Sequence, residues 1–539
     1  MLILQGKGVF SGTAIGPVKI YRIAAAATQT QTVADPAAEQ ERFTLAKKKA
    51  QDQLAALGKK ALAESGEETA ALFDVHQMML DDPDYVENVE TLITAEKINA
   101  EAAVEQTGQK FAALFAAMDD AYMQARSADV LDISRRVITI LSGREDSLRL
   151  TGPSLLAAAD LSPSETVALD KNNLLGFLTE AGSTNSHTAI LARTMGIPAV
   201  VAAGPFLDQL RDGQQLIVDG TAGKIYVDPD AATLHKMQAQ YEQEQTQKKL
   251  LAELKAKPNV TRSGKTVKIF ANIGRPEDLA AALANDAGGI GLFRSEFLYL
   301  EQETFPSEEK QFQAYKQVLT GMQDKEVVIR TLDIGADKQC AYFNLEHEAN
   351  PALGYRAIRI CLTRPEIFKT QLKAILRASV FGKARIMLPM ITSVQEVEEA
   401  KALLNEAKTE LAAAKIPYAQ DLPLGIMIET PAAALISDEL AQHVDFFSVG
   451  TNDLTQYTLA LDRQNPHLDK FFNPHHPALL KLIALAAKNA HAAGIWIGIC
   501  GELGADLELT EQFLKLDIDE LSVAPANILP LRHKVRSLE

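Results

Sequence analysis

Cysteine, tryptophan and long hydrophobic runs are all scarce in this chain of 539 residues. Its three cysteines, Cys340, Cys361 and Cys500, include no CxxC pair, which argues against a disulfide framework or a zinc site and indicates a reducing compartment. No apolar run approaches the roughly 20 residues that span a bilayer. The first residues lack the basic and long apolar segments of a signal peptide. We therefore expect a cytoplasmic protein that is not inserted in a membrane.

Positive charge is also in deficit. The formal net charge is −16, which argues against nucleic acid or an anionic membrane surface as a main partner and leaves room for a basic protein partner. The hydrophobic and charged contents, 47% and 23%, are ordinary for a globular protein. A chain of this length exceeds one core, so we expect several domains.

The first half divides by composition into three parts. Residues 1–30 and 142–230 contain short β-branched runs punctuated by Gly and Pro, which predicts a small α/β domain. Residues 31–141 are rich in Ala, Glu, Gln and Lys at helical spacing, which predicts an inserted helical bundle. Residues 231–258 form a polar run ending near a proline, which predicts a linker helix.

The remaining residues, 259–539, repeat one pattern eight times. Each short β-rich run is followed by a helix-like segment, and eight such units over this length predict a (β/α)₈ TIM barrel. A doubly wound open sheet is the alternative, but no GxGxxG follows the first strand. The predicted strands lie in residues 267–274, 289–297, 327–335, 384–392, 424–430, 445–453, 496–503 and 519–525.

Polar residues gather at the carboxyl ends of these predicted strands, where the active site of such a barrel forms. A single arginine there most often pairs with a neighbouring carboxylate, but several arginines and carboxylates on one rim are costly to assemble unless something polyanionic binds. The residues are Arg294, Glu296, Arg330, Asp333, Glu429, Asn452, Asp453, Arg463, Cys500 and Glu502.

The residue types at this rim suggest distinct roles. Arginine grips phosphate and carboxylate through two bonds, so the three arginines Arg294, Arg330 and Arg463 suggest a substrate that carries both groups. Glu429 and Asp453 are hard oxygen donors suited to Mg²⁺. The lone Cys500 is either a small core residue or, facing a bound enol, a proton donor.

A histidine follows a cap-like sequence in "AGSTNSHTAILARTMGIPAVV". Asn185 or Ser186 can cap a helix that begins at His187, and Gly196 followed by Pro198 ends it. His187 then lies in the first turn, where free N–H groups and the helix dipole favour a phosphate and keep the imidazole neutral. The same pattern also occurs at ordinary surface helices, so its interpretation depends on the barrel.

Many of these motifs together resemble the PEP-utilising enzymes. The barrel carries "GGIGLFRSEFLYL", "VVIRTLDIGADKQ", "NPALGYRAIRI", "MIETPAA", "FFSVGTNDLTQYTLALDR" and "GICGELGAD", and the upstream "NSHTAILARTMGIPAVV" is similar to the family's phosphohistidine domain. The helical insertion, with "ALFDVHQMMLDDPDYVENV" and "ARSADVLDISRR", resembles helices that bind a carrier protein in one member. The resemblance covers nearly the whole chain.

The resemblance implies a specific activity. A phosphoryl group would pass from phosphoenolpyruvate to Nε2 of His187 and then to a histidine of the carrier protein HPr, the first step of the sugar phosphotransferase system. HPr would dock on the helical region around His76, Met78 and Met79, and the barrel would form a homodimer. The remaining roles implied are substrate binding by Arg294, Arg330, Asn452, Asp453 and Arg463, Mg²⁺ binding by Glu429 and Asp453, and protonation of the enolate by Cys500.

One departure from the family pattern lies beside the histidine. Before the histidine, the family usually has two glycines, a basic or polar residue, a threonine and a serine. In this chain Gly182 and Ser186 occupy the first and last of these five positions, and Ser183, Thr184 and Asn185 occupy the three between them. Hydroxyls of Thr184, Ser186 and Thr188 remain to steady a phosphoryl group. We expect the reaction to be kept, with altered local phosphate contacts.

Three alternative functions compete with this one. A phosphoenolpyruvate synthase or pyruvate phosphate dikinase needs a nucleotide-binding domain ahead of the histidine, and only 186 residues precede His187 here. A nitrogen-related paralogue carries an extra N-terminal sensory domain. A non-catalytic scaffold for HPr-like partners is expected to have lost part of the charge set, which is present in full.

Overall fold

The computed structural model of the chain divides it into two compact units, residues 1–248 and 249–539. Each unit has hydrophobic cores of its own. The residues that the structure describes are 1–22, 29–65, 67–118, 121–143, 150, 152–169, 173–182, 187–300, 302–335 and 340–539.

The N-terminal unit is built on an eight-stranded sheet of order β1-β8-β7-β3-β4-β5-β6-β2. Pairing is parallel from β3 to β6 and antiparallel elsewhere. Successive residues of β4 enter different cores, Leu155 and Ala157 one and Leu156 and Ala158 the other, so this strand is covered on both faces. The strands are β1 (Leu2–Gln5), β2 (Lys7–Phe10), β3 (Thr13–Tyr21), β4 (Ser154–Ala158), β5 (Leu174–Thr179), β6 (Ala199–Val201), β7 (Gln215–Asp219) and β8 (Lys224–Val227).

Among the described residues, five helices lie between β3 and β4, as the composition of this region predicts. In α1, the residues Phe43, Ala46, Ala50 and Leu54 recur at three- and four-residue spacing and are all buried, which is the pattern of a helix with one apolar face. The helices are α1 (Pro36–Ser65), α2 (Glu67–Leu80), α3 (Pro83–Ala95), α4 (Ala100–Ala116) and α5 (Ala121–Leu141). Shorter helices in the sheet region are α6 (Pro163–Ala168), α7 (His187–Met195) and η2 (Leu207–Gln209).

The polar helix predicted after the sheet is α8 (Ala231–Ala252), in which Met237 is the buried residue. Within the first unit, the Glu244 carboxylate of this helix accepts hydrogen bonds from the backbone N–H of Thr13 at 2.7 Å and from its hydroxyl at 3.0 Å. Within the second unit, Arg532 donates to the carbonyl of Leu254 at 2.8 Å. Both ends of this connecting stretch are therefore anchored to their own unit.

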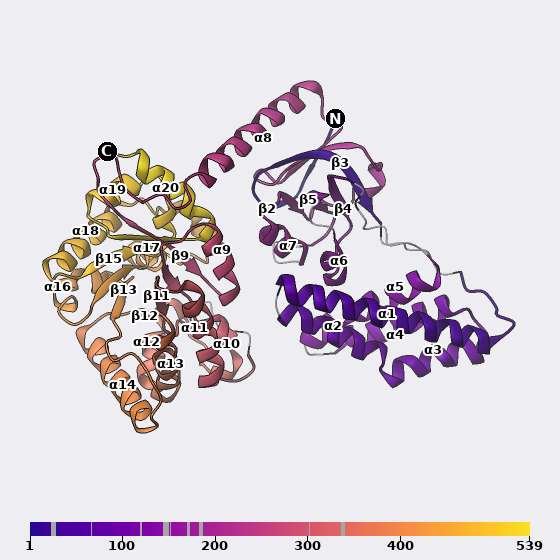
Figure 1. Ribbon diagram of the computed structural model, residues 1–539, viewed down its shortest axis with the longest axis horizontal. Helices are drawn as coiled ribbons and strands as arrows, with labels where there is room; N and C mark the ends of the chain where they lie inside the picture. Colours follow the sequence, from indigo (N-terminus) through magenta and orange to yellow (C-terminus); the bar gives the residue numbers. More distant parts are fainter. Residues whose placement is uncertain are drawn as a thin grey trace. The chain divides into compact units, whose positions relative to one another are not determined.

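The C-terminal unit is a closed barrel of eight parallel strands surrounded by helices (Figure 1). The predicted fold class, an α/β domain with a helical insertion, a linker helix and a TIM barrel, is confirmed. The barrel strands are β9 (Lys268–Ile273), β10 (Ile290–Phe293), β11 (Glu326–Arg330), β12 (Lys383–Leu388), β13 (Leu424–Ile428), β14 (Phe446–Val449), β15 (Trp496–Ile499) and β16 (Glu520–Val523).

The barrel helices pack their apolar faces against the outside of these strands in one large core. The α-helices are α9 (Leu279–Ala284), α10 (Phe297–Leu300), α11 (Glu308–Met322), α12 (Ile358–Thr363), α13 (Pro365–Ala378), α14 (Val394–Ala413), α15 (Pro431–Leu435), α16 (Ser437–Leu440), α17 (Thr451–Leu459), α18 (Pro477–Ala492), α19 (Thr510–Lys515) and α20 (Ile528–Ser537). The short 3₁₀ helices are η3 (Pro276–Asp278), η4 (Ala341–Phe343), η5 (Pro351–Leu353), η6 (Ser379–Phe381), η7 (Pro466–Phe471), η8 (Glu502–Ala505) and η9 (Pro525–Asn527). Within the described part of the chain, no helix has the length and apolar character needed to cross a membrane.

Aromatic side chains fill the amino-terminal end of the barrel interior. The rings of Phe446 and Trp496, the first residues of β14 and β15, stack at 4.6 Å with an interplanar angle of 2°. A Cβ at Gly425 would lie 2.5 Å from the Phe446 ring, so only glycine at that position leaves room for the stack. Lys268 and Arg385 lie over the Trp496 ring at 5.6 and 5.7 Å.

Candidate active site

A cavity of about 950 Å³ opens at the carboxyl ends of the barrel strands. Its walls combine residues from strand ends and from the loops that follow them, which is where the active sites of such barrels form. The predicted site residues that line it are Arg294, Arg330, Glu429, Asn452, Asp453, Arg463 and Cys500. The structure therefore brings together every barrel residue that the sequence analysis singled out.

Arg330, the last residue of β11, is fixed at the base of this cavity. It is 5% exposed, and its Nη2 lies 2.5 Å from Oε1 of Glu296 while its Nη1 lies 3.2 Å from Oδ2 of Asp333. Burial alone disfavours the charge, but Glu296 and Asp333 hold the pKa of the guanidinium above its ordinary value. Arg330 is a permanent, rigidly held positive charge.

A second buried arginine, Arg356, was missed by the sequence analysis. Its Nη2 lies 2.8 Å from Oδ1 of Asp333, and its Nη1 lies 3.5 Å from Oδ1 of Asp453 and 3.2 Å from the Tyr457 hydroxyl. Arg356 precedes α12 and is not at a strand end, so its closeness to the rim depends on the path of a long loop. The sequence feature that could have pointed to Arg356 is the motif "NPALGYRAIRI", in which it lies and from which no site residue was predicted.

The other two arginines are less enclosed. Arg294 is exposed and forms no ion pair with any described residue, and partial desolvation together with Arg330 lowers the pKa of its guanidinium. Nη2 of Arg463 lies 3.9 Å from Oδ1 of Asp453, and its backbone N–H donates to Gln456 at 3.0 Å. Both guanidinium groups are available to an anion in the cavity.

Glu429 and Asp453 place carboxylates on the same cavity wall. Oε1 of Glu429 accepts the backbone N–H of Met390 at 2.6 Å, whereas its Oε2 is buried without a hydrogen-bond partner among the described residues. Burial, Asp453 and Asp333 raise the pKa of Glu429 to about 8. A Cβ at Gly450 would lie 2.6 Å from Oε2, so a glycine makes the space that this oxygen occupies.

These two carboxylates fit a magnesium ion. Mg²⁺ takes oxygen ligands and is usually held by one or two protein carboxylates plus substrate oxygens. A buried carboxylate oxygen without a partner, next to a second carboxylate, is costly unless a cation or proton satisfies it. The donor set is therefore of the right chemistry for Mg²⁺.

Asn452 is locked by its neighbour Glu502. Its Nδ2 donates to Oε1 of Glu502 at 3.2 Å, and its Oδ1 accepts the backbone N–H of Glu502 at 3.1 Å. Because both ends of the amide are engaged, the orientation of the side chain is fixed before any ligand binds.

Cys500 follows β15 and is 2% exposed. Its thiol points to the carbonyl of Val449, with an Sγ to O distance of 3.7 Å. Burial raises the pKa of this thiol to about 11, so it is protonated at neutral pH. Cys340 and Cys361 do not line the cavity.

Helix α7 begins at His187, as predicted. The expected helix end is also confirmed, since Gly196 has φ of 65° and Ile197 donates its N–H to the carbonyl of Ala192 at 3.1 Å. Thr188 is fully buried, and its hydroxyl has no hydrogen-bond partner among the described residues. The predicted cap and the departure from the family pattern, residues 183–186, lie outside the described residues.

One predicted docking residue is not at the surface. His76 is fully buried, with Nε2 3.2 Å from Oδ1 of Asp129, so it cannot contact a docked protein directly. Met78 is 72% exposed, and Met79 is partly buried. The spacing of Phe73, His76 and Leu80, all fully buried, is the signal that places His76 on the inner face of α2.

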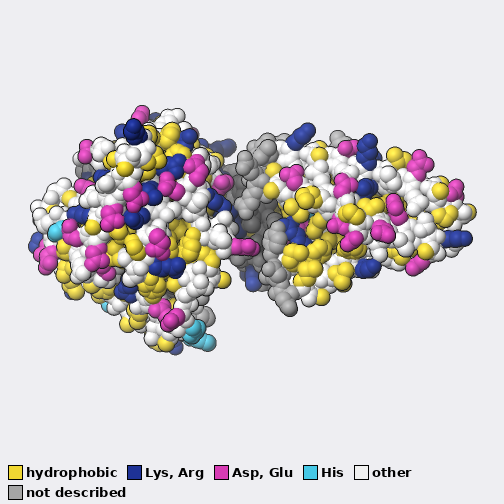
Figure 2. Space-filling model, turned by 90° about the horizontal axis from the view of Figure 1, so that it is seen from below, with side chains coloured by type: hydrophobic (Ala, Val, Ile, Leu, Met, Phe, Trp, Pro, Cys, Tyr) yellow, Lys and Arg dark blue, Asp and Glu magenta, His cyan; other side chains and the backbone are white. Residues whose placement is uncertain are grey.

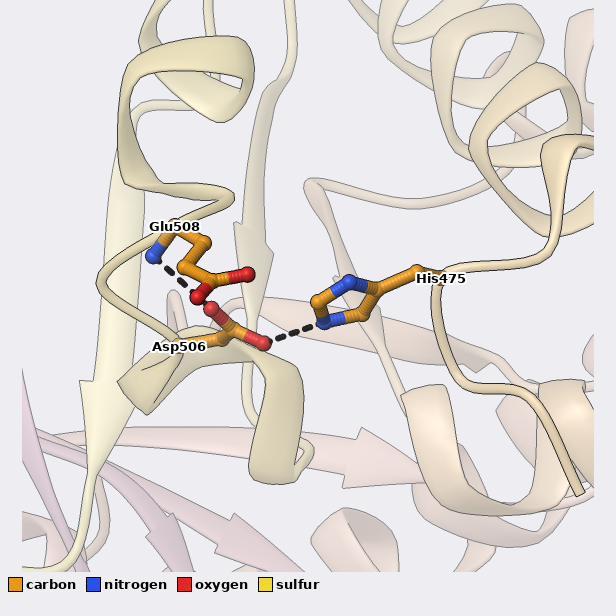
Figure 3. Close-up of side chains that lie close together, drawn as sticks. All are labelled: His475, Asp506 and Glu508. Carbon is orange, nitrogen blue, oxygen red and sulfur yellow. Dashed lines mark hydrogen bonds and ion pairs between the residues drawn. The ribbon is translucent and has the colours of Figure 1, made fainter.

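A further cluster, absent from the sequence analysis, lies beside the cavity (Figure 3). Nε2 of His475 is 2.5 Å from Oδ2 of Asp506, and the backbone N–H of Glu508 donates to Asp506 at 2.8 Å. Asp506 also lines the cavity. The three side chains are partly or fully exposed, and their mutual bonds are those that tie the loop before α18 to the loop after η8.

Taken together, the barrel and its rim define an enzyme that binds a small polyanion, with the exposed Arg294, the half-buried Arg463 and a carboxylate pair suited to Mg²⁺ lining one cavity. Comparison with known proteins identifies the family of this enzyme. Family models match residues 5–126 (PEP-utilising enzyme, N-terminal), 150–223 (PEP-utilising enzyme, mobile domain) and 248–539 (PEP-utilising enzyme, PEP-binding domain). The chain belongs to the PEP-utilising enzyme family.

Individual relatives agree over the whole length. The chain is 42% identical over 543 residues to a phosphoenolpyruvate-protein phosphotransferase of Bacillus sp. (strain S), covering 98% of this chain and 93% of the relative. It is 40% identical over 539 residues to the protein of the same name from Bacillus subtilis (strain 168), covering 99% of this chain and 94% of that relative.

A structure described as Enzyme I (nEIt), solved by NMR, matches 45% of this chain and 99% of its own, with 31% identity and a TM-score of 0.39.

Proposed function

We propose that the protein takes the phosphoryl group of phosphoenolpyruvate onto its own His187, passes it to a histidine of the carrier protein HPr, and releases pyruvate. The observation that carries this proposal is that arginines, a carboxylate pair and a buried thiol line one and the same cavity. Full-length similarity to phosphoenolpyruvate-protein phosphotransferases supports the same reaction.

The arginines hold the substrate in this proposal. Phosphoenolpyruvate carries a phosphate and a carboxylate, and guanidinium groups bind both through paired hydrogen bonds. Arg294 and Arg463 line the cavity, while Arg330, paired with Glu296, contributes a fixed positive charge there. Asn452, already locked by Glu502, donates without further ordering.

Glu429 and Asp453 hold Mg²⁺ in this proposal. A bound Mg²⁺ would supply positive charge to offset the negative charge of the phosphoryl oxygens. Arg356 keeps Asp453 oriented through its 3.5 Å contact, and Met390 does the same for Glu429 through its backbone N–H.

Cys500 delivers the proton that converts the enolate to pyruvate. Because burial raises the pKa of the thiol to about 11, the group carries its proton at neutral pH and can act as a general acid. Its position at the end of β15, lining the same cavity as Arg330 and Glu429, puts it within the substrate site.

His187 accepts the phosphoryl group. It starts α7, and the N-terminus of a helix favours negative charge and disfavours imidazolium. A neutral imidazole has the lone pair needed for in-line attack on phosphorus.

HPr docks on the helical insertion in this proposal. Figure 2 shows hydrophobic side chains gathered over this part of the N-terminal unit with acidic side chains among them. Exposed apolar residues here are Leu45, Met78, Leu114 and Met118. Exposed Asp74, Asp81 and Asp82 lie beside Met78 in the chain and suit a basic partner.

The same proposal includes the domain boundaries and the assembly. Residues 1–30 and 142–230 form the phosphohistidine domain, 31–141 the HPr-binding subdomain, 231–258 the linker helix, and 259–539 the barrel through which the protein dimerises in the cytoplasm. A swivel of the N-terminal half about the linker brings His187 alternately to the barrel and to HPr. Solution scattering with and without phosphoenolpyruvate and Mg²⁺ tests the swivel, and an unchanged profile contradicts it.

The central test uses radiolabelled phosphoenolpyruvate and Mg²⁺. Wild type takes up acid-labile, base-stable label, His187→Ala does not, and the control His235→Ala, an exposed histidine of α8, labels like wild type. Equal labelling of wild type and His187→Ala contradicts the assignment.

A further inference from the structure

Helix α6 joins the helical insertion to the sheet region of the N-terminal unit (Figure 1). Val167 of this helix packs in the buried cluster of the insertion. Leu161 and Leu169, which flank the helix, pack instead in the cluster that contains Ala192 of α7. The α6 segment, residues 161–169, is therefore packed into both parts at once, and it contacts α7, the helix that begins at the predicted phosphohistidine.

Two hydrogen bonds from the insertion hold the amino-terminal end of α6. The Ser162 hydroxyl donates to Oδ1 of Asp132 at 2.9 Å, and Nη2 of Arg136 donates to the Ser164 hydroxyl at 3.0 Å. Asp132 and Arg136 are four residues apart in α5, so they lie on one face of that helix. Asp132 is 6% exposed and Ser164 is fully buried, so these bonds are shielded from water.

Ser162 is also the N-cap of α6. Its hydroxyl accepts the backbone N–H of Glu165 at 3.3 Å, and Oε2 of Glu165 accepts the backbone N–H of Ser162 at 2.7 Å. Oε1 of Glu165 accepts the hydroxyl of Tyr21, the last residue of β3, at 2.5 Å. The capping box therefore ties the start of α6 to the sheet, while the same Ser162 hydroxyl ties it to the insertion.

The second oxygen of Asp132 faces α2. Oδ2 of Asp132 lies 3.8 Å from Nδ1 of His76, and Nε2 of the same fully buried ring lies 3.2 Å from Oδ1 of Asp129. Met78, two residues further along α2, is 72% exposed and belongs to the proposed HPr surface. Asp132 thus contacts both the helix that presents the docking surface and the cap of the helix that packs against α7.

We propose that Asp132 is a positioning residue for phosphoryl transfer to HPr: it holds the start of α6 against the insertion and so sets where His187 lies relative to a docked HPr. This inference rests on the proposed function. In that step a lone pair of the HPr imidazole forms a bond to phosphorus while the bond from phosphorus to His187 breaks, and the nitrogen of His187 keeps the electron pair. In-line transfer of this kind requires the two nitrogens and the phosphorus to be aligned.

The two half-reactions make different demands on this junction. HPr docks on the insertion, whereas the phosphohistidine is carried by α7, so their alignment depends on the joint that connects the two parts. Transfer from phosphoenolpyruvate takes place at the barrel cavity and uses no contact of α2. Loss of the Asp132 contacts should therefore slow the second half-reaction and spare the first.

The two half-reactions can be measured separately. Labelled phosphoenzyme is made from radiolabelled phosphoenolpyruvate and Mg²⁺, freed of substrate, and mixed with HPr at a series of concentrations in a rapid-quench instrument. The first stage gives the rate of label uptake. The second gives the maximal rate of transfer to HPr and the HPr concentration at half of that rate.

Asp132→Leu, which keeps the branched shape of the side chain and removes both contacts, is expected to lower the maximal rate of transfer to HPr by about 10- to 100-fold. The rate of label uptake and the half-saturating HPr concentration stay unchanged, because neither the cavity nor an exposed docking side chain is altered. Asp132→Asn keeps an oxygen that accepts the Ser162 hydroxyl, so it restores most of the rate. Ser162→Ala removes the same bond from the other side, is expected to be slow as well, and keeps the test open should Asp132→Leu fold poorly.

The matched control for the lost cap is Ser393→Ala. Ser393 caps α14 of the barrel with the same kind of capping box, in which its hydroxyl accepts the backbone N–H of Glu396 at 3.3 Å. This substitution removes a helix cap without touching α6, so both half-reactions are expected to stay unchanged.

Four results overturn the inference: an unchanged maximal rate in both Asp132→Leu and Ser162→Ala, equal slowing of both half-reactions, a raised half-saturating HPr concentration with an unchanged maximal rate, or an Asp132→Asn as slow as Asp132→Leu. A wild type that takes up no acid-labile label, or that keeps its label when HPr is added, overturns the proposed function and the inference with it. These last results are seen before any variant is compared.

Discussion

The Nη1 atom of Arg356 lies 3.5 Å from Oδ1 of Asp453, so a residue from a long loop orients a carboxylate at the start of α17. The same guanidinium contacts Asp333 at 2.8 Å and is 2% exposed. One buried cation therefore contacts two carboxylates, and one of them, Asp453, is a ligand of metal and substrate in the proposed function.

Arg356→Met is expected to lower the free energy of unfolding by about 3–5 kcal/mol, because it removes a buried cation that contacts both Asp333 and Asp453. Urea unfolding followed by tryptophan fluorescence measures the barrel, since the chain has one tryptophan, Trp496. Arg262→Met is the control: its ion pair with Glu539 is 3.5 Å long and exposed, worth about 0–1 kcal/mol. Equal effects of the two substitutions contradict the buried-network interpretation.

The Cys500 thiol is expected to react slowly with iodoacetamide in the native protein. The thiolate is the reactive form, and a pKa of about 11 means that the rate rises roughly tenfold per pH unit up to that value. Peptide mapping by mass spectrometry distinguishes Cys500 from Cys340 and Cys361. A rate that levels off near pH 8.5, the ordinary range of a thiol, contradicts this prediction.

Met78 and His76 are two residues apart in α2 but are expected to behave differently. Met78→Ala removes a side chain that is 72% exposed and should weaken HPr binding, by roughly 1 kcal/mol or more if it is a central contact, without changing stability. His76→Ala empties a fully buried position and should destabilise the helical insertion. Calorimetric titration with HPr and thermal unfolding measure the two effects, and a stability loss in Met78→Ala would argue against its surface role.

Glu520→Gln is expected to gain stability relative to wild type as the pH rises from about 4.5 to about 8. The folded pKa of Glu520 is raised from 4.5 to about 8, so between these values the unfolded chain releases a proton that the folded chain keeps, and wild type becomes less stable as the pH rises. The difference should reach a few kcal/mol, since one pKa unit is about 1.4 kcal/mol. Urea midpoints of metal-free proteins from pH 5 to pH 8, followed by Trp496 fluorescence, check this trend, and a constant difference contradicts it.

The barrel could be predicted because its strands follow simple rules. Each strand is short and buried on both faces, so it appears in the sequence as an apolar run, and the helices between them repeat at even spacing. Parallel strands bring their carboxyl ends to one rim, so Arg330, Glu429 and Cys500 could be grouped without knowing any distance.

The residues that were missed depend on information that periodicity does not carry. Arg356 reaches the rim through an irregular loop, whose path no spacing rule determines. Glu520 begins a buried strand, and its position opposite Gly498 can be seen only once the strand register is known. The burial of His76 could have been predicted, since this residue continues the helical spacing of the buried Phe73 and Leu80. It was instead assigned to the docking surface because its segment resembles a docking motif.

The attachment of α8 has a mechanical consequence. Glu244 is tied to Thr13 and Leu254 is tied to Arg532, while most residues between them are exposed and polar. This part of the helix has almost no lateral packing, so its stiffness comes from backbone hydrogen bonds and the helix-forming tendency of Gln, Lys and Leu. The rigidity of the joint between the two units is therefore a property that sequence changes in residues 245–253 can adjust without disturbing either core.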